Sequence, residues 1–353
     1  MTNEALFFIG FIVLIVAVLM VDLLLVGRKT HIVSTKEAAI WSGIWIGLAL
    51  LFSLFLEMRG DMVHGIENMA DLQRVTTLYA SHLKLIPDNF EASLQLYRDN
   101  MAIAYLTGYL IEKTLSVDNL FVILMILTAF GVRTQHYKPI LFWGIMGAIV
   151  LRFIFIFVGA ALIKKFDWIL LIFGGFLVYS AIKMYIDRNK EEKIDPQHHP
   201  IVKFLSKYFR VFPKYIGGNF FVKKDARIYI TPLFIVLVLI EFSDLIFAFD
   251  SIPAIFAVTL DPYVVFFSNI FAILGLRALF FLLIKIVHKF YLLKAGVSIL
   301  LFYIGLKLLF HHYLDEIGYE NMYSLIFISV VLVGSIVLSL VFPKKVHNNE
   351  IMN

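Results

Sequence analysis

The sequence contains no cysteine and few charged residues, and both shortages narrow what the protein can be. Without cysteine there are no disulfides, thiolate metal sites, Cys-x-x-Cys redox pairs or cysteine nucleophiles. Charged residues make up 16% of the 353 residues and hydrophobic residues 61%. In soluble domains charged residues make up about 25% and apolar residues about 45–50%. This composition argues against a soluble enzyme, a disordered chain and a coiled coil.

Long apolar runs dominate the sequence. A transmembrane helix needs roughly 20 mostly apolar residues, and we count about nine such runs. Pro139, Pro232 and Pro262 lie in the first turn of a run, where the missing N–H costs nothing. We therefore predict an all-α polytopic membrane protein with about nine transmembrane helices. The runs are 5–27, 38–56, 101–130, 139–163, 166–186, 228–260, 262–287, 291–312 and 322–342.

The distribution of Lys and Arg among the loops predicts the orientation, because these residues accumulate on the cytoplasmic side. The segment 57–100 holds seven acidic residues against four basic ones. The alternate loops, counted from the first, are basic: 28–37, 131–138, 187–227, the turn near 285–294 and the C-terminal tail. We therefore predict an N-terminus outside the membrane and a cytoplasmic C-terminus.

The loop stretch 203–215, KFLSKYFRVFPKY, interleaves basic and aromatic residues. This pattern can serve nucleic-acid binding, but beside membrane spans it favours contact with the inner lipid leaflet. We expect the lipid bilayer, and no nucleic acid, as its partner.

Two parts of the chain repeat each other. When residues 101–186 are set beside 230–312, Glu112 to Asp118 align with Asp244 to Asp250, Arg152 with Arg277, and Lys183 with Lys307. Each copy holds three predicted spans, so the second copy enters the membrane from the opposite face. Inverted repeats of this kind are typical of secondary transporters, whose sites lie near the midplane at the repeat interface. The alternative is a duplicated scaffold without transport.

These observations divide the chain into six predicted segments. They are 1–56 with two N-terminal transmembrane helices, 57–100 as an extracytoplasmic insert, 101–186 as the first three-helix repeat, 187–227 as a basic cytoplasmic loop, 228–312 as the second three-helix repeat, and 313–353 with the last transmembrane helix and a cytoplasmic tail.

Charged residues lie inside the predicted spans, where each costs roughly 2.5–3.5 kcal/mol if unpaired. Six acids face two arginines there, so ion pairs with Arg152 and Arg277 neutralise only part of the acidic charge. The excess carboxylate favours a cation or protons. The acids are Asp22, Glu112, Asp118, Glu241, Asp244 and Asp250.

The spacing of these acids limits how they can act together. Glu112 and Asp118 are six residues apart, as are Asp244 and Asp250. On a straight helix this is about 9 Å of rise and roughly 120° of rotation, too far for two carboxylates to share one ion. Either the helices are broken there, or each acid joins acids of the other repeat. Pro253 favours a break, because it leaves the Phe249 carbonyl without its helical donor; a plain kink is the alternative.

Carboxylate, amide and hydroxyl oxygens without thiolates select Mg²⁺, Ca²⁺ or Mn²⁺ over Zn²⁺ or copper. The residues that we predict to bind such a cation are Glu112, Asp118, Asn119, Glu241, Asp244, Asp250 and Ser251, with Asp22, Arg152 and Arg277 as supporting charges.

Several of these residues also carry a resemblance to a known family. The chain resembles the TerC family of integral membrane proteins, most closely its Alx-like branch, over roughly 300 residues. The segment 57–100 is longer than the family pattern. The matching motifs are Asp22-Leu with Arg28-Lys, Lys36-Glu-Ala, Trp41-Ser, Leu106 to Phe121 with Glu112 and Asp118-Asn119, Phe142-Trp-Gly-Ile, Thr231-Pro-Leu-Phe, Glu241-Phe-Ser-Asp244, Ile246 to Ala254 and Ser268 to Arg277.

The resemblance implies manganese export across the cytoplasmic membrane of a bacterium and, in some relatives, supply of Mn²⁺ to secreted metalloenzymes. It maps the functional acids to Glu112, Asp118 and Asp250, with Glu241 and Asp244 beside them. The family name comes from tellurium resistance, and Alx-like members are often labelled redox modulators. The alternative function is therefore a non-transporting membrane stress protein that partners stress or secretion systems.

We do not expect an enzyme, and we expect no resident cofactor, only transported Mn²⁺. Intramembrane aspartyl proteases need a Gly-x-Gly-Asp element, and CAAX-type proteases need a Glu-Glu pair with helical histidines. Neither motif occurs in this sequence.

Overall fold

The computed structural model describes residues 3–27, 34–166, 168–188, 199–224, 227–286 and 292–342. Outside these ranges lie parts of the basic loops 28–37 and 187–227, part of the turn near 285–294, and the tail beyond residue 342. The side chain of Asp22 also lies outside the described part, although its backbone belongs to the first helix.

Every predicted apolar run coincides with a helix or a helix pair. The helices are α1 (Asn3–Gly27), α2 (Thr35–Arg59), α3 (Asp61–His64), α4 (Met69–Tyr79), α5 (Phe90–Ala129), the 3₁₀ turn η1 (Thr134–His136), α6 (Tyr137–Lys165), α7 (Trp168–Asp187), α8 (Pro200–Tyr208), α9 (Pro232–Phe256), α10 (Pro262–Leu274), α11 (Leu276–Ile286), α12 (Leu293–Leu309), α13 (His311–Glu316) and α14 (Asn321–Val341).

Local signals fix several helix starts. Ser34, Asn68 and Asn89 are N-caps whose side chains accept a hydrogen bond from a backbone N–H of the first turn. Pro232 and Pro262 occupy the first positions of α9 and α10, where no N–H partner is needed. The prolines entered the sequence-based prediction but the N-caps did not, and the starts of α4 and α5 were therefore missed.

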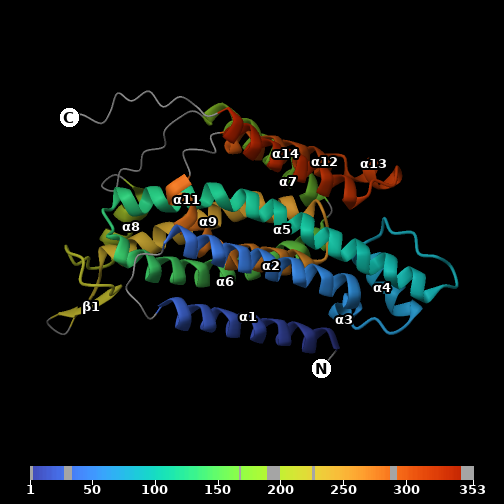
Figure 1. Ribbon diagram of the computed structural model, residues 1–353, viewed down its shortest axis with the longest axis horizontal. Helices are drawn as coiled ribbons and strands as arrows, with labels where there is room; N and C mark the ends of the chain where they lie inside the picture. The colour runs from blue at the N-terminus through green and yellow to red at the C-terminus, as the bar shows by residue number, and fades with distance from the viewer. Residues whose placement is uncertain are drawn as a thin grey trace.

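Six of the described helices are long and apolar enough to cross a membrane, or seven if α10 and α11 form one bent span. Figure 1 shows them side by side in one elongated bundle. Its outer surface is apolar: Leu51, Ile172 and Val330 are each more than half exposed. This arrangement fits the predicted all-α polytopic membrane fold. The two other predicted spans lie on α5, which carries Glu112, Lys113 and Asp118, and on α12, which has only 17 residues.

Helices α7 and α12 form the most extensive helix pair of the bundle. Each contributes a glycine at the closest approach: a Cβ at Gly174 would lie 3.0 Å from the Gly305 carbonyl oxygen, and a Cβ at Gly305 would lie 3.0 Å from the Gly174 oxygen. By contrast, a Cβ at Gly175 would meet nothing within 4 Å. Small residues therefore let the two backbones touch, as is usual between membrane helices.

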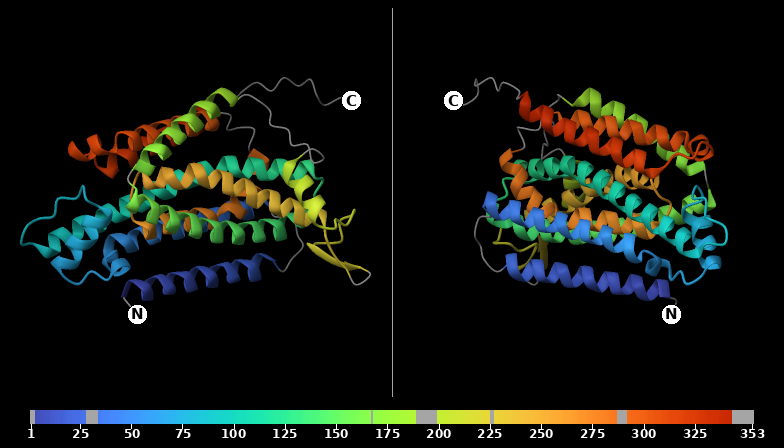
Figure 2. Two further views of the ribbon diagram at one scale, coloured as in Figure 1. Left: turned by 180° about the vertical axis from the view of Figure 1, so that it is seen from behind. Right: turned by 45° about the vertical axis from the view of Figure 1, so that its right-hand side comes forward.

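The two ends of the bundle differ, and both figures show it (Figure 1 and Figure 2). One end carries α3 and α4 of the acidic segment 57–100 together with the start of α1. The opposite end carries α8 and the two strands. There the Tyr215 hydroxyl donates to the Phe130 carbonyl at the end of α5. The acidic segment and the basic loop thus lie at opposite ends, as their charges suggested.

A buried histidine ties the acidic segment to the bundle. His64 lies between two carboxylates: its Nε2 is 2.8 Å from Asp261 Oδ2 and its Nδ1 is 3.2 Å from Glu4 Oε1. Burial of the ring disfavours the charged form, but Asp261 and then Glu4 outweigh it and raise the pKa of His64 to about 9. This contact joins α3 to the start of α1 and to the N-cap of α10, and sequence reasoning did not find it.

Three sequence expectations need correction. The break expected at Asp250–Pro253 is absent, since α9 runs through Pro253 to Phe256; a proline in the last turn removes only one backbone hydrogen bond. The break occurs instead around Gly275, where α10 and α11 meet at 43°. Strands β1 (Phe221–Lys224) and β2 (Arg227–Ile230) form an antiparallel pair that an all-α prediction omitted.

The predicted segment boundaries also shift. Helix α5 begins at Phe90, well inside the predicted insert 57–100, and continues without interruption to Ala129. The last part of the insert is therefore the start of the first long helix of the repeat. The N-cap at Asn89 is the local cause of this early start.

Candidate functional site

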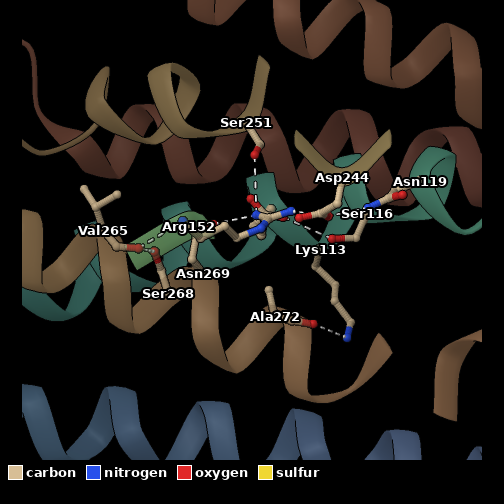
Figure 3. Close-up of polar contacts among 11 residues, drawn as sticks. Lys113, Ser116, Asn119, Arg152, Asp244, Ser251, Val265, Ser268, Asn269 and Ala272 are labelled. Carbon is tan, nitrogen blue, oxygen red and sulfur yellow. Dashed lines mark hydrogen bonds and ion pairs between the residues drawn. The ribbon is translucent and has the colours of Figure 1, made fainter. Parts of the chain in front are cut away.

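The centre of the bundle holds a buried arginine between acids of two helices. Arg152 on α6 is 1% exposed. Its Nη1 forms an ion pair with Glu112 of α5, and its Nη2 lies 3.1 Å from Asp244 Oδ1 of α9. Figure 3 shows the guanidinium pointing into this cluster. Because Glu112 and Asp244 occupy aligned positions, Arg152 joins one acid of each aligned segment.

Polar side chains complete the surroundings of these charges. Arg152 Nη1 also donates to Asn269 Oδ1 at 2.6 Å, and Ser251 Oγ lies 3.5 Å from it (Figure 3). Asn119 donates to Asp244 Oδ1 at 2.7 Å. We call Arg152, Glu112, Asn119, Asp244, Ser251 and Asn269 the arginine cluster. Sequence reasoning missed Asn269 as a site residue, although a Ser268-Asn269 pair within a long apolar run was a usable signal.

The two carboxylates of the arginine cluster share one counter-charge, the Arg152 guanidinium, which ties α5, α6 and α9 together. Each carboxylate already faces the guanidinium, and a buried ion pair is favourable only when hydrogen bonds satisfy its remaining atoms. One oxygen of each acid, Glu112 Oε2 and Asp244 Oδ2, is buried and accepts no hydrogen bond from the residues described.

A second group of predicted acids lines a separate groove of about 490 Å³ between α5, α7 and α9. Asp118 of α5 and Asp250 of α9 both line it, and they hold aligned positions in the two repeats. Ser180 of α7 forms a hydrogen bond with Asp250, and Lys183 acts on the same carboxylate electrostatically. We call this the acid groove. It lies between the α7–α12 pair and the helices of the arginine cluster.

Asp250 retains ligand capacity in the acid groove. Its Oδ1 is buried and has no hydrogen-bond partner among the described residues. The groove extends from Asp250 to residues at the end of α7 and the start of α12, Asp187, Arg188 and Lys294. It therefore connects a deep carboxylate with the end of the bundle that carries the basic loop.

The remaining predicted residues lie apart from the acid groove. Glu241 on α9 packs so closely against α6 that a Cβ at Gly147 would overlap its carboxylate. Arg277 is 7% exposed and lines a small cavity of about 30 Å³ with Asn119 and Asp244. Over the part of the chain that is described, no three His, Asp or Glu side chains converge as a ready-made metal site. Four of the predicted acids are thus divided between the arginine cluster and the acid groove, and Glu241 belongs to neither.

Comparison with known proteins identifies the family. The model of the TerC family of integral membrane proteins matches residues 97–347. The chain is 41% identical over 327 residues to a Salmonella typhi protein named as a membrane-bound redox modulator, Alx, covering 92% of each. It is 42% identical over 307 residues to the protein of that name from Escherichia coli K12, covering 86% of each.

An uncharacterized membrane protein of Myxococcus xanthus, STKORF319, is 38% identical over 341 residues, which are 97% of this chain and 94% of that one. No solved structure matches the chain. Because the family model covers well over half of the sequence and the relatives align over most of both chains, this protein belongs to the TerC family of integral membrane proteins.

Proposed function

We propose that this protein exports a divalent metal cation, Mn²⁺ in the first place, across the bacterial cytoplasmic membrane, and that it is a transporter rather than an enzyme. The observation that carries the proposal is the acid groove, in which Asp118 and Asp250 from aligned helices line one cavity. Two carboxylates and the Ser180 hydroxyl offer hard oxygen ligands, which suit Mn²⁺ and other hard divalent cations. The release of Mn²⁺ to secreted metalloenzymes is the corresponding downstream role.

The division of the acids defines their proposed roles. Asp118 and Asp250 bind the cation, whereas Glu112 and Asp244 hold Arg152 and keep the helices together. Since one divalent cation neutralises two carboxylates, occupation of the groove removes the cost of two negative charges within the membrane. The route begins at the basic end of the bundle, to which the groove extends.

We also propose the number of membrane passes, the inverted repeats and the orientation of the termini. Nine transmembrane passes follow if α5 and α12 cross the membrane with the others and α10–α11 count as one pass. The three helices α5, α6 and α7 and the set α9, α10–α11 and α12 are then inverted repeats, with the N-terminus outside and the C-terminus in the cytoplasm. The extensive α7–α12 pairing supports this, because it brings together the last helix of each repeat.

The test is Mn²⁺ content and flux in variants of the groove acids. Asp118→Asn and Asp250→Asn change the side-chain volume little but remove the charge, so we expect each to abolish export while the protein stays in the membrane. Asp99→Asn is the matched control, since Asp99 lies on the same helix as Asp118 but not among the groove residues.

Each variant is expressed in a manganese-sensitive, exporter-deficient host. Its protein level is checked by blot, cellular Mn by mass spectrometry, and flux in everted membrane vesicles. Normal export by both groove variants at normal protein level would overturn the proposal.

The relatives are named as membrane-bound redox modulators, and the second function that we consider is therefore a redox modulator or stress protein without transport activity. The sequence contains no cysteine that could carry thiol redox chemistry. The two functions are separated by the same vesicle assay: a stress protein without transport activity gives no Mn²⁺ flux above that of empty vesicles.

A further inference from the structure

The acid groove contains a lysine on its α7 wall. Lys183 lines the groove together with Asp118 and Asp250. The residue is exposed rather than packed. A lysine carries a compact charge at the end of a flexible four-carbon side chain. Its ammonium can therefore approach the acids or move away from them without a movement of the helix.

The other basic residues at the groove are placed differently. The Arg188 guanidinium lies 3.9 Å from the centre of the Tyr185 ring and donates to the Tyr185 carbonyl oxygen. Lys294 belongs to the first turn of α12, at the end of the groove. Lys183 lies three residues after Ser180, the α7 residue that hydrogen-bonds to Asp250, and therefore on the same side of the helix.

The aligned lysine of the second repeat provides a comparison. Lys307 donates to Asn321 Oδ1 at 3.2 Å and to Ser324 Oγ at 3.0 Å, both on α14. It is not among the residues that line the acid groove. The two repeats therefore place equivalent lysines differently: Lys183 lines the groove with the two acids, and Lys307 hydrogen-bonds to α14.

We propose that Lys183 is a tethered counter-cation that competes with the metal ion for the carboxylates of the acid groove and thereby sets the affinity for the transported cation. The inference rests on the proposed export function. In the empty groove the ammonium balances part of the charge of Asp118 and Asp250. A divalent cation, with twice the charge and direct carboxylate contact, displaces it. When the metal leaves, Lys183 returns and disfavours rebinding.

The physical basis is the repulsion between the positive charge of Lys183 and a cation that binds in the same groove. A tenfold change in affinity corresponds to about 1.4 kcal/mol, the scale of a charge interaction that solvent partly screens. Removing a fixed positive charge from the site therefore strengthens cation binding but also slows release. An ordinary structural lysine would instead affect assembly without changing the affinity for the metal.

The experiment uses the full-length protein in proteoliposomes, with initial rates measured against Mn²⁺ concentration by an enclosed divalent-cation indicator. For Lys183→Gln we expect the KM for Mn²⁺ to fall roughly tenfold and the maximal rate to fall with it. Lys183→Arg restores the positive charge and should return KM toward the wild-type value. Lys307→Gln is the matched control and should leave KM unchanged.

Equilibrium Mn²⁺ binding to the detergent-solubilised protein, followed by electron paramagnetic resonance, gives a readout independent of turnover. Tighter binding by Lys183→Gln supports the inference, and Lys183→Met serves if the glutamine variant does not assemble. An unchanged or weakened affinity in a well-assembled variant overturns it. If the wild-type protein itself neither binds nor transports Mn²⁺, the proposed function fails; if it does both and Lys183→Gln is unaltered, only the role of Lys183 fails.

Discussion

Replacing Arg152 by glutamine should destabilise the protein strongly, because it leaves two buried carboxylates without their counter-charge. Glu112 is 1% exposed and Asp244 4%, so water cannot take the place of the guanidinium. Removing one partner of a buried ion pair costs about 3–5 kcal/mol. Since one guanidinium serves both acids, we expect at least this value, which is a large part of a typical net stability of about 5–15 kcal/mol.

The assay is the yield and thermal unfolding of a detergent-solubilised fluorescent fusion, followed by size-exclusion chromatography. For Arg152→Gln we expect a reduced membrane level and a fall in melting temperature on the order of 10 °C. Lys164→Gln, an exposed position at the end of the same helix, should behave like the wild type. Adding Glu112→Gln and Asp244→Asn to Arg152→Gln should recover part of the loss, because the uncompensated charges disappear.

The reasoning is refuted if Arg152→Gln assembles at the normal level with an unchanged melting temperature. Normal assembly combined with lost Mn²⁺ flux would move Arg152 from the structure into the transport mechanism. Arg152→Lys separates charge from geometry: a single ammonium cannot contact Glu112, Asp244 and Asn269 together, so an intermediate stability is expected.

Three further predictions concern the rest of the bundle. The pKa of His64 is raised from 6.5 to about 9, so its protonated form should contribute about 3 kcal/mol of stability below pH 6.5. This contribution is lost as the pH rises through about 9. His64→Gln should flatten the resulting pH dependence of the melting temperature. Gly174→Ala should lower the melting temperature, since its Cβ meets α12 backbone, whereas Gly175→Ala should not, and equal effects would contradict the close packing. A reporter fused after Asn353 should be active only in the cytoplasm, and periplasmic activity would rule out the nine-span topology.

The sequence by itself determined where the long apolar helices are. Apolar runs and first-turn prolines such as Pro232 act over a few residues, so their effect is readable without the fold, whereas the N-cap at Asn89 was missed. The opposite placement of the acidic segment and the basic loop follows from charge and from the alternation of spans. The prediction of a helix break at Pro253 was wrong, because the effect of a proline depends on how much helix follows it.

Only the tertiary structure decided which charges meet. The sequence offered six intramembrane acids as one set, but helix packing pairs Glu112 and Asp244 with Arg152 and leaves Asp118 and Asp250 in a separate groove. Asp244 lies 92 positions from Arg152, and such a contact depends on the rotation and depth of three helices rather than on local pattern. Packing therefore decided which acids bind the guanidinium and which line a separate groove.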